Sequence, residues 1–248
     1  MTQYDFSGQT AIVTGGTRGI GAAISEAFLA AGATVVATYA GNQAAAEAFA
    51  ARQAAHAGRL HLRAFDVGDY AAAEAFFKWF DTVSPNLEIL VNNAGIRRDS
   101  VVGMMACADW DAVLRTNLTG SFAMSKFAVM RMLSNRYGRI IHITSPSGKF
   151  GFEGQANYAA SKAGQVALMR SLSKEVARRK ITVNCVSPGF IDTEFIGALP
   201  PEQLKAYQES IPVRRLGQPA EIAHGVLFLA SREAAYVNGA VLEITGGL

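Results

Sequence analysis

The chain has 248 residues, of which 50% are hydrophobic and 17% are charged, and its formal net charge is +3. This composition supplies a sizeable core, and we expect a single globular domain over residues 1–248. Lysines and arginines are spread along the chain without a run of like charges, which argues against nucleic acid as a partner and against a polybasic membrane anchor.

Targeting signals and metal ligands are also missing from the sequence. The amino terminus, MTQYDFSGQTAIVTGG, has no charged segment followed by a long apolar one, and the chain has no long uninterrupted apolar stretch, so we expect a cytoplasmic protein without a membrane span. Cys107 and Cys185 stand far apart without a Cys-x-x-Cys pattern, which predicts buried thiols in a reducing compartment. The histidines lack the spacing of zinc ligands, and no metal site is expected.

Short β-branched runs alternate with longer helical patterns along the chain. The predicted strands are, in chain order, 10–14, 33–38, 59–65, 88–92, 139–144, 181–186 and 240–245. The predicted helices are 19–31, 42–57, 70–83, 109–136, 157–179 and 219–231. Alternation with apolar strands predicts an α/β protein whose doubly wound, Rossmann-type parallel sheet has about seven strands and binds ligands at their carboxyl ends. The longest irregular stretch, 188–218, suits a substrate lid.

A glycine-rich loop, TGGTRGIG, follows the first strand and leads directly into a helix. Gly15, Gly19 and Gly21 permit a tight turn and a close approach of backbone N–H groups to a diphosphate at the helix N-terminus. The spacing differs from G-x-G-x-x-G, and glycine clusters are common in such turns. The order of strand, loop and helix nevertheless favours a dinucleotide site.

The end of the second strand predicts which dinucleotide binds. A site for NAD usually has an acidic residue there, but this chain reads ATYAGN, with Thr38 and Tyr39 and no carboxylate before Glu47. The glycine loop offers Arg18, whose guanidinium suits a 2′-phosphate. We therefore expect NADP(H). The alternative is that Arg18 is an ordinary solvated loop residue.

The segment NYAASKAG places Tyr158 and Lys162 on one face of a helix. A free phenol has a pKa of about 10, and a nearby ammonium would favour the phenolate and so make tyrosine a better proton shuttle near neutral pH. In the alternative reading, Tyr158 packs in the core while Lys162 extends to water. The four-residue spacing alone does not choose between them.

Several motifs in one order resemble the short-chain dehydrogenase/reductase family from residue 6 to residue 248. They are TGGTRGIG, DV at 66–67, NNAG at 92–95, Asn117 in RTNLTGS, Ser145 in HITSPSG, YAASK at 158–162 and PG at 188–189. The resemblance implies a catalytic tetrad of Asn117, Ser145, Tyr158 and Lys162. It implies that Tyr158 donates a proton, Ser145 hydrogen-bonds the substrate oxygen, Lys162 keeps the phenol acidic and holds the nicotinamide ribose, and Asn117 orders a water.

The same resemblance implies where the cofactor binds. Asp66 and Val67 would flank the adenine, the NAG segment would line the ribose side, and Ile191 and Thr193 would contact the carboxamide. The full cofactor-binding set is Gly15, Thr17, Arg18, Gly19, Ile20, Gly21, Thr38, Asp66, Val67, Asn93, Ala94, Gly95, Tyr158, Lys162, Pro188, Gly189, Ile191 and Thr193.

Within the family, NNAGIRRDS, GQANYAASKAG, EVARRKITVNCVSPGFIDTEF and RLGQPAEIAHGVLFLAS are most similar to 3-oxoacyl-[acyl-carrier-protein] reductases. This implies NADPH-dependent reduction of 3-oxoacyl thioesters on acyl carrier protein. Acetoacetyl-CoA, a polyketide, a sugar or another small ketone is the alternative substrate, and a non-catalytic NADP-binding sensor is the alternative of another class. Pro146 after the serine departs from the usual pattern, and GKF at 148–150 is expected to affect the pocket.

Two arginines match the carrier-docking positions of that group. Arg136 and Arg179 would dock the acidic carrier protein near the mouth of the active site, although an arginine at the end of a long helix also complements the helix dipole. The family resemblance further implies a homotetramer formed through the helices at 109–136 and 156–179.

Overall fold

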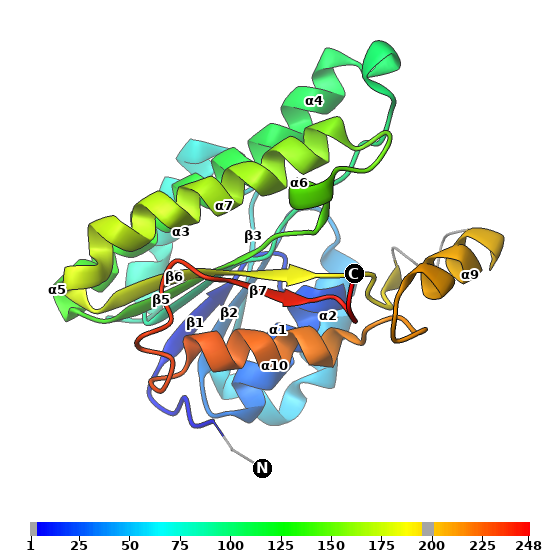
Figure 1. The fold of residues 1–248 in the computed structure, drawn as a ribbon. Helices are drawn as coiled ribbons and strands as arrows, with labels where there is room; N and C mark the ends of the chain where they lie inside the picture. Colours follow the sequence, from blue (N-terminus) through cyan, green and yellow to red (C-terminus); the bar gives the residue numbers. More distant parts are fainter. Residues whose placement is uncertain (1–3, 195–200) are drawn as a thin grey trace.

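The computed structural model describes residues 4–194 and 201–248, and its seven strands form one parallel sheet (Figure 1). The strand order is β3-β2-β1-β4-β5-β6-β7. The strands are β1 (Thr10–Val13), β2 (Thr34–Tyr39), β3 (Leu60–Ala64), β4 (Ile89–Asn92), β5 (Gly138–Ile143), β6 (Ile181–Pro188) and β7 (Val241–Ile244). The predicted α/β class, the parallel pairing and all seven strands are confirmed.

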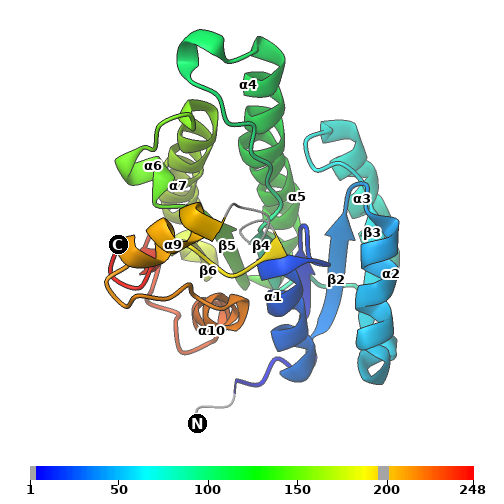
Figure 2. The same ribbon diagram turned by 90° about the vertical axis from the view of Figure 1, so that its right-hand side faces the viewer.

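Helices cover both faces of the sheet (Figures 1 and 2). One layer holds α1 (Gly19–Ala30), α2 (Gln43–Arg52) and α10 (Pro219–Ala230), and the other holds α3 (Tyr70–Val83), α5 (Gly120–Asn135) and α7 (Ala156–Val176). Shorter helices are α4 (Cys107–Leu114), α6 (Ser147–Phe150) and α9 (Pro201–Ser210), and 3₁₀ turns occur at Ala54–Arg59, Val102–Met104 and Ala177–Arg179.

Two apolar clusters, one on each face, hold the layers together. Phe28 and Phe49 pack with the α1 and α10 side of the sheet, whereas Phe76, Phe77 and Phe80 pack with the α3 and α5 side. Strands β1, β4, β5 and β6 are buried on both faces, which explains why they read as continuous apolar runs in the sequence.

The strand order creates the place where a ligand can bind. The chain moves outward from β1 to β2 and β3, then returns to β4 on the other side of β1. The loops that follow β1 and β4 therefore leave toward opposite faces and open a crevice at the carboxyl ends of these strands. Helix α9 and the carboxyl terminus lie at this same edge (Figure 1).

Three local expectations are wrong. The helix predicted over 109–136 is interrupted by a π-helical turn at Arg115–Thr119, which separates α4 from α5. The segment 188–218 is not irregular throughout, because it contains α9; residues 195–200 of this segment lie outside the described residues. Cys107 is exposed, whereas Cys185 is buried as expected.

Among the helices of residues 4–194 and 201–248, none combines the length and the apolar character needed to cross a membrane.

Candidate active site

The glycine loop forms a cradle at the start of α1. Gly15 and Gly19 have φ angles of 61° and 49°, in the left-handed region that glycine tolerates best. A side chain at Gly21 would place its Cβ 2.1 Å from the carbonyl oxygen of Gly15, so only glycine fits there. Arg18 is the N-cap of α1 and makes no side-chain cap hydrogen bond, which leaves the first-turn N–H groups directed at the crevice.

The loop after β4 is fastened to the glycine loop by side-chain hydrogen bonds. The Thr14 hydroxyl accepts from the backbone N–H groups of Asn93 and Ala94, each at 3.0 Å. The Asn93 amide donates to the carbonyl oxygens of Thr14 and Gly15 at 2.9 and 3.1 Å. Two segments that are far apart in sequence therefore form one rigid floor, and this arrangement fits a bound dinucleotide.

The far end of the crevice contains the residues expected near the adenine. The Asp66 carboxylate accepts from the backbone N–H of Gly68 at 2.8 Å, which fixes the turn after β3. Thr38 is buried near the end of β2, and Tyr39 is the last residue of that strand, so no carboxylate occupies the NAD-type position. Arg18 lies 3.9 Å from Glu194, and both side chains are more than half exposed.

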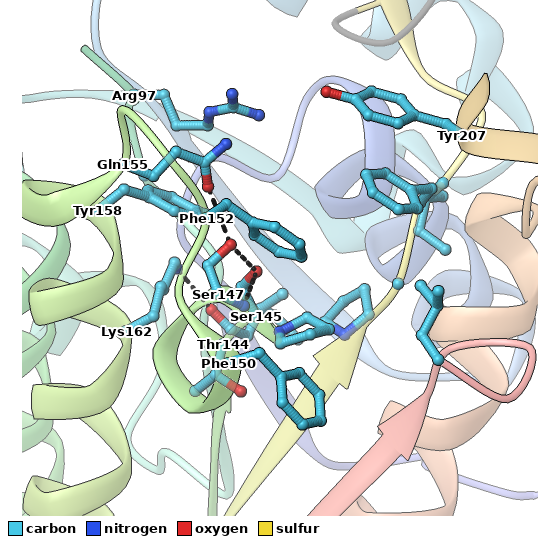
Figure 3. Close-up of a pocket in the computed structure, with 18 of the residues that line it drawn as sticks. Arg97, Thr144, Ser145, Ser147, Phe150, Phe152, Gln155, Tyr158, Lys162 and Tyr207 are labelled. Carbon is cyan, nitrogen blue, oxygen red and sulfur yellow. Dashed lines mark hydrogen bonds between the residues drawn. The ribbon is translucent and has the colours of Figure 1, made fainter. Parts of the chain in front are cut away.

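Three residues of the expected tetrad meet beyond the end of β5 (Figure 3). Ser145 follows this strand, and Tyr158 and Lys162 lie on the first turns of α7. The Lys162 ammonium donates to the carbonyl oxygen of Ile143 at 2.7 Å and lies 5.5 Å from the centroid of the Tyr158 ring. The two side chains share one face of α7, but Lys162 is buried, so the reading in which it extends to water is wrong.

Asn117 sits in the π-helical turn and is completely buried. Its side-chain amide donates to the carbonyl oxygen of Ile96 at 3.0 Å and to the Ser161 hydroxyl at 3.1 Å, and its side-chain oxygen accepts from the N–H of Ile96 at 2.8 Å. Its backbone carbonyl accepts from Ser121 and from Gln165. The role of Asn117 in ordering a water stays a prediction.

A chain of hydroxyls extends the site beyond Ser145, and sequence reasoning missed it. The Ser145 hydroxyl donates to that of Ser147 at 3.2 Å, and Ser147 donates to the side-chain oxygen of Gln155 at 3.0 Å (Figure 3). Pro146 is the N-cap residue of the short helix α6, where its missing N–H breaks no helical hydrogen bond, so the unusual proline is compatible with the turn that presents Ser145.

Burial has the largest effect on the pKa values of Tyr158 and Lys162. Loss of solvent raises the pKa of Tyr158 above its ordinary value, while the positive charge of Arg97 and a hydrogen bond with Ser145 act in the opposite direction. Loss of solvent lowers the pKa of Lys162 to about 8. The same effect, helped by the nearby charge of Lys162, lowers the pKa of His142 to about 3. His142 is therefore a neutral core residue.

A cavity of about 1080 Å³ opens above these residues. Aromatic side chains form much of its wall. Phe190 stacks on Tyr207 of α9 with ring centroids 4.3 Å apart, and Phe150 and Phe152 lie on the opposite side (Figure 3). Residues expected to bind the cofactor also line it, among them Ile20, Asn93, Gly95, Pro188, Gly189, Ile191 and Thr193. The 188–218 segment thus contributes to the cavity wall through Phe190 and α9.

Arg136 and Arg179 lie away from this cavity. Arg136 stands two residues before Gly138, the first residue of β5, and Arg179 stands two residues before Ile181, the first residue of β6. Gly138 and Ile181 are partners in the sheet. The two arginines are close to each other at the amino edge of the sheet, whereas Ser145 follows the opposite end of β5. The expectation that they border the mouth of the active site of their own chain is wrong.

A dinucleotide cradle beside a half-buried serine and tyrosine and a buried lysine defines a nicotinamide-dependent oxidoreductase. A family model described as enoyl-(acyl carrier protein) reductase matches residues 15–248. The chain belongs to the short-chain dehydrogenase/reductase family.

Named relatives match almost the whole chain. It is 42% identical to a 3-oxoacyl-[acyl-carrier-protein] reductase of Vibrio harveyi and 43% identical to that of Escherichia coli, with 98% of each chain covered in both comparisons. It is 44% identical to an acetoacetyl-CoA reductase of Shinella zoogloeoides, over 96% of this chain and 98% of the relative.

Lys162 gives folding stability a specific pH dependence. Its pKa is about 8 in the folded protein against 10.5 for an ordinary lysine, so between these values the unfolded chain holds a proton that the folded chain lacks. Stability therefore rises with pH across this window, and near neutral pH the folded state carries a penalty of up to roughly 3 kcal/mol.

We expect Lys162→Met to raise the free energy of unfolding, relative to the parent, by more at about pH 7 than at about pH 10. Urea denaturation of both proteins, without cofactor, measures the two differences. Equal differences at both pH values would show that Lys162 is not buried as a weakened base.

Proposed function

We propose that this protein reduces 3-oxoacyl thioesters carried by acyl carrier protein to 3-hydroxyacyl thioesters, with NADPH as reductant. The observation that carries the proposal is the convergence of Ser145 and Tyr158 in a large cavity that continues into the dinucleotide cradle. The names of the relatives support this substrate class.

The chemistry follows from where the hydroxyl groups lie. The ketone gains a hydride at carbon and a proton at oxygen, and reduced nicotinamide supplies the hydride when bound. The Ser145 and Tyr158 hydroxyls would hydrogen-bond the ketone oxygen, and Tyr158 would transfer its proton as negative charge develops there. Ser147 positions Ser145 through its backbone N–H, which donates to the Ser145 oxygen at 3.2 Å. Without substrate the Ser145 hydroxyl donates to Ser147, which donates to Gln155, and it would turn its proton to the ketone oxygen when the substrate binds.

Two other substrate assignments use the same site. An acetoacetyl thioester of coenzyme A is supported by the acetoacetyl-CoA reductase relative. A polyketide, a sugar or another small ketone would use the same proton donor. The name of the family model indicates reduction of a carbon–carbon double bond, but two hydroxyl donors at one point in the cavity suit a ketone oxygen better.

The residues near the expected 2′-position support NADPH over NADH. No carboxylate ends β2, and Arg18 extends from the glycine loop toward the exposed carboxylate of Glu194. A 2′-phosphate would offer Arg18 a doubly charged, hydrogen-bonding partner in place of that weak ion pair.

Because Arg136 and Arg179 lie at the amino edge of the sheet, we propose that they dock the carrier protein for the active site of a second copy of the chain. Helix α5 exposes Phe122, Met130 and Leu133, which is the apolar surface expected of a helix that packs in a homotetramer. If two copies pack α5 antiparallel about a two-fold axis, the Arg136 end of one lies toward the cavity edge of the other. The basic pair would then serve the partner's active site.

The first test of this function removes the proton donor. Tyr158→Phe keeps the ring and loses only the hydroxyl, so we expect turnover to fall by about 10²- to 10⁴-fold while NADPH binding stays nearly unchanged. Steady-state kinetics and fluorescence titration of NADPH measure the two effects. Retention of most of the turnover, with hydride transfer rate-limiting, would remove Tyr158 from the mechanism.

The second test concerns cofactor choice. Arg18→Ala should weaken NADPH binding by roughly 10- to 150-fold and NADH binding much less, because a charge-assisted hydrogen bond to the 2′-phosphate is lost. Glu194→Gln is the matched control, since it removes the competing carboxylate and should not weaken NADPH. Equal losses of both cofactors in Arg18→Ala would mean that Arg18 does not contact the 2′-phosphate.

The third test separates a carrier-protein reductase from a general ketone reductase. The double variant Arg136→Glu/Arg179→Glu should lower kcat/KM for the carrier-bound substrate but spare a small thioester with the same acyl group. The loss should shrink as salt rises, because exposed charges are screened within about 8 Å at physiological ionic strength.

Sedimentation of the double variant controls for assembly. Equal losses on the carrier-bound and the small thioester would indicate structural damage. Unchanged kinetics on both would reject carrier docking at these arginines and favour the small-ketone alternative.

A further inference from the structure

Arg97 places a second cation beside the proton donor. It follows β4 by five residues and lines the cavity. Its guanidinium carbon lies 5.8 Å from the centroid of the Tyr158 ring. Figure 3 shows the Arg97 side chain above Gln155 and Tyr158, extending toward Tyr207.

The loop holds this arginine in place. The preceding residue, Ile96, is hydrogen-bonded through both its N–H and its carbonyl to Asn117. On the other side, the Ser100 N–H donates to the carbonyl oxygen of Gly154 at 2.8 Å, and the Asn157 amide donates to that of Arg98 at 2.8 Å. The loop is thereby fixed to the start of α7, which carries Tyr158.

Arg97 itself is oriented by an ion pair. Its Nε donates to the Asp99 carboxylate at 3.1 Å, and a second guanidinium nitrogen contacts the other carboxylate oxygen. Only 27% of the Arg97 side chain is exposed. Because the guanidinium is planar and held on one edge, its position relative to the phenol ring is defined.

The charged and titratable groups that act on Tyr158 or line the cavity around it come from four segments. Arg97 and Asp99 lie on the loop after β4, Lys162 on α7 and Tyr207 on α9, and Glu153 precedes α7 at the cavity wall. Arg97 lowers the pKa of Tyr158, whereas Asp99 acts weakly in the opposite direction. The charge of Arg97 thus remains effective beside its carboxylate partner.

A constant cation is useful here because Lys162 is not one. Its Nζ is engaged by the carbonyl oxygen of Ile143, and burial lowers its pKa to about 8, so its charge fades in mildly alkaline solution. An arginine remains charged throughout the working pH range.

We propose that Arg97 is a positioning residue for proton transfer, whose guanidinium favours the phenolate form of Tyr158 and thereby helps set the pH at which that hydroxyl exchanges its proton. The inference rests on the proposed function only in taking Tyr158 as the group that exchanges a proton with the substrate. It does not depend on whether the substrate is carried by a protein or by coenzyme A.

The test is the pH profile of kcat/KM for Arg97→Gln, Arg97→Lys and the parent. An opposite charge at this distance shifts a pKa by about one to three units, and Asp99 reduces the effect. In Arg97→Gln we therefore expect the pH at which kcat/KM falls to half its maximum on the alkaline side to rise by about one unit. The shift should appear in both reduction and oxidation, because the overall equilibrium constant ties the two directions together at every pH. Arg97→Lys should restore most of the parental profile.

Arg52→Gln is the control for general loss of charge. Arg52 is exposed at the end of α2, over Phe49, and its removal changes the net charge of the protein equally. Its profile should match that of the parent. An ultraviolet difference titration of each cofactor-free protein against its Tyr158→Phe counterpart reads the phenolate directly and needs no substrate.

The outcomes are distinct. An upward shift in Arg97→Gln alone, in both the kinetic and the ultraviolet titrations, supports the proposal. An unshifted midpoint with lower kcat/KM would overturn it and make Arg97 a substrate contact or a structural residue. A normal ultraviolet shift without any ketone reduction would instead refute the proposed function and leave the electrostatic role of Arg97 standing.

Discussion

The amide of Asn117 is the interaction on which the rest of the site depends. From a fully buried position it joins the loop after β4, through Ile96, to α7, through Ser161. Arg97 follows Ile96 in the sequence, and Lys162 follows Ser161. An unpaired amide at such depth would cost roughly 1–3 kcal/mol, so the three segments are fixed relative to one another as a unit. The π-helical turn is what directs this side chain inward between them.

A buried lysine is costly, and the surrounding residues show how the fold accommodates it. The Lys162 ammonium has the Ile143 carbonyl as acceptor, and its charge disfavours protonation of His142 while moderating the raised pKa of Cys185, which is about 12. His142 and Cys185 are paired across β5 and β6 and stay uncharged near neutral pH. The charge of Lys162 thus lies beside two groups that stay neutral, which is the condition under which a small number of nearby groups can control proton affinity.

Much of the fold was predictable because its signals are local. Apolar strands such as β5 and β6, and the amphipathic α3, are specified by periodicity within each segment. The turn at Arg115–Thr119 was not predictable, because nothing in the segment RTNLT distinguishes a π-helical turn from an α-helical one. The extra residue is stabilised by hydrogen bonds that Gln165 and Ile96 donate to Asn117. By contrast, α9 carried a signal that was overlooked, since PEQLKAYQES begins with proline and continues with good helix formers.

The site was predictable only where residue spacing or a family motif marked it, and long-range placement was not. The glycine loop and the Tyr158–Lys162 pair are local patterns. Arg97 beside the phenol and Arg136 far from the cavity depend on how distant segments pack, which spacing does not encode.

The Gly15 carbonyl is held by the close approach of Gly21 and by a hydrogen bond from Asn93, and this contact has a thermodynamic consequence. A flexible glycine loop would lose conformational entropy when a ligand arrives, at about 1–2 kcal/mol for each residue that becomes ordered. In this protein the loop is already ordered by the Asn93 amide and by backbone contact, so its conformational entropy is lost when the chain folds and not when the ligand binds. Cofactor affinity and conformational stability are therefore coupled through the same few atoms. A change that loosens the loop would be detected first as weaker cofactor binding and only secondarily as a lower free energy of unfolding.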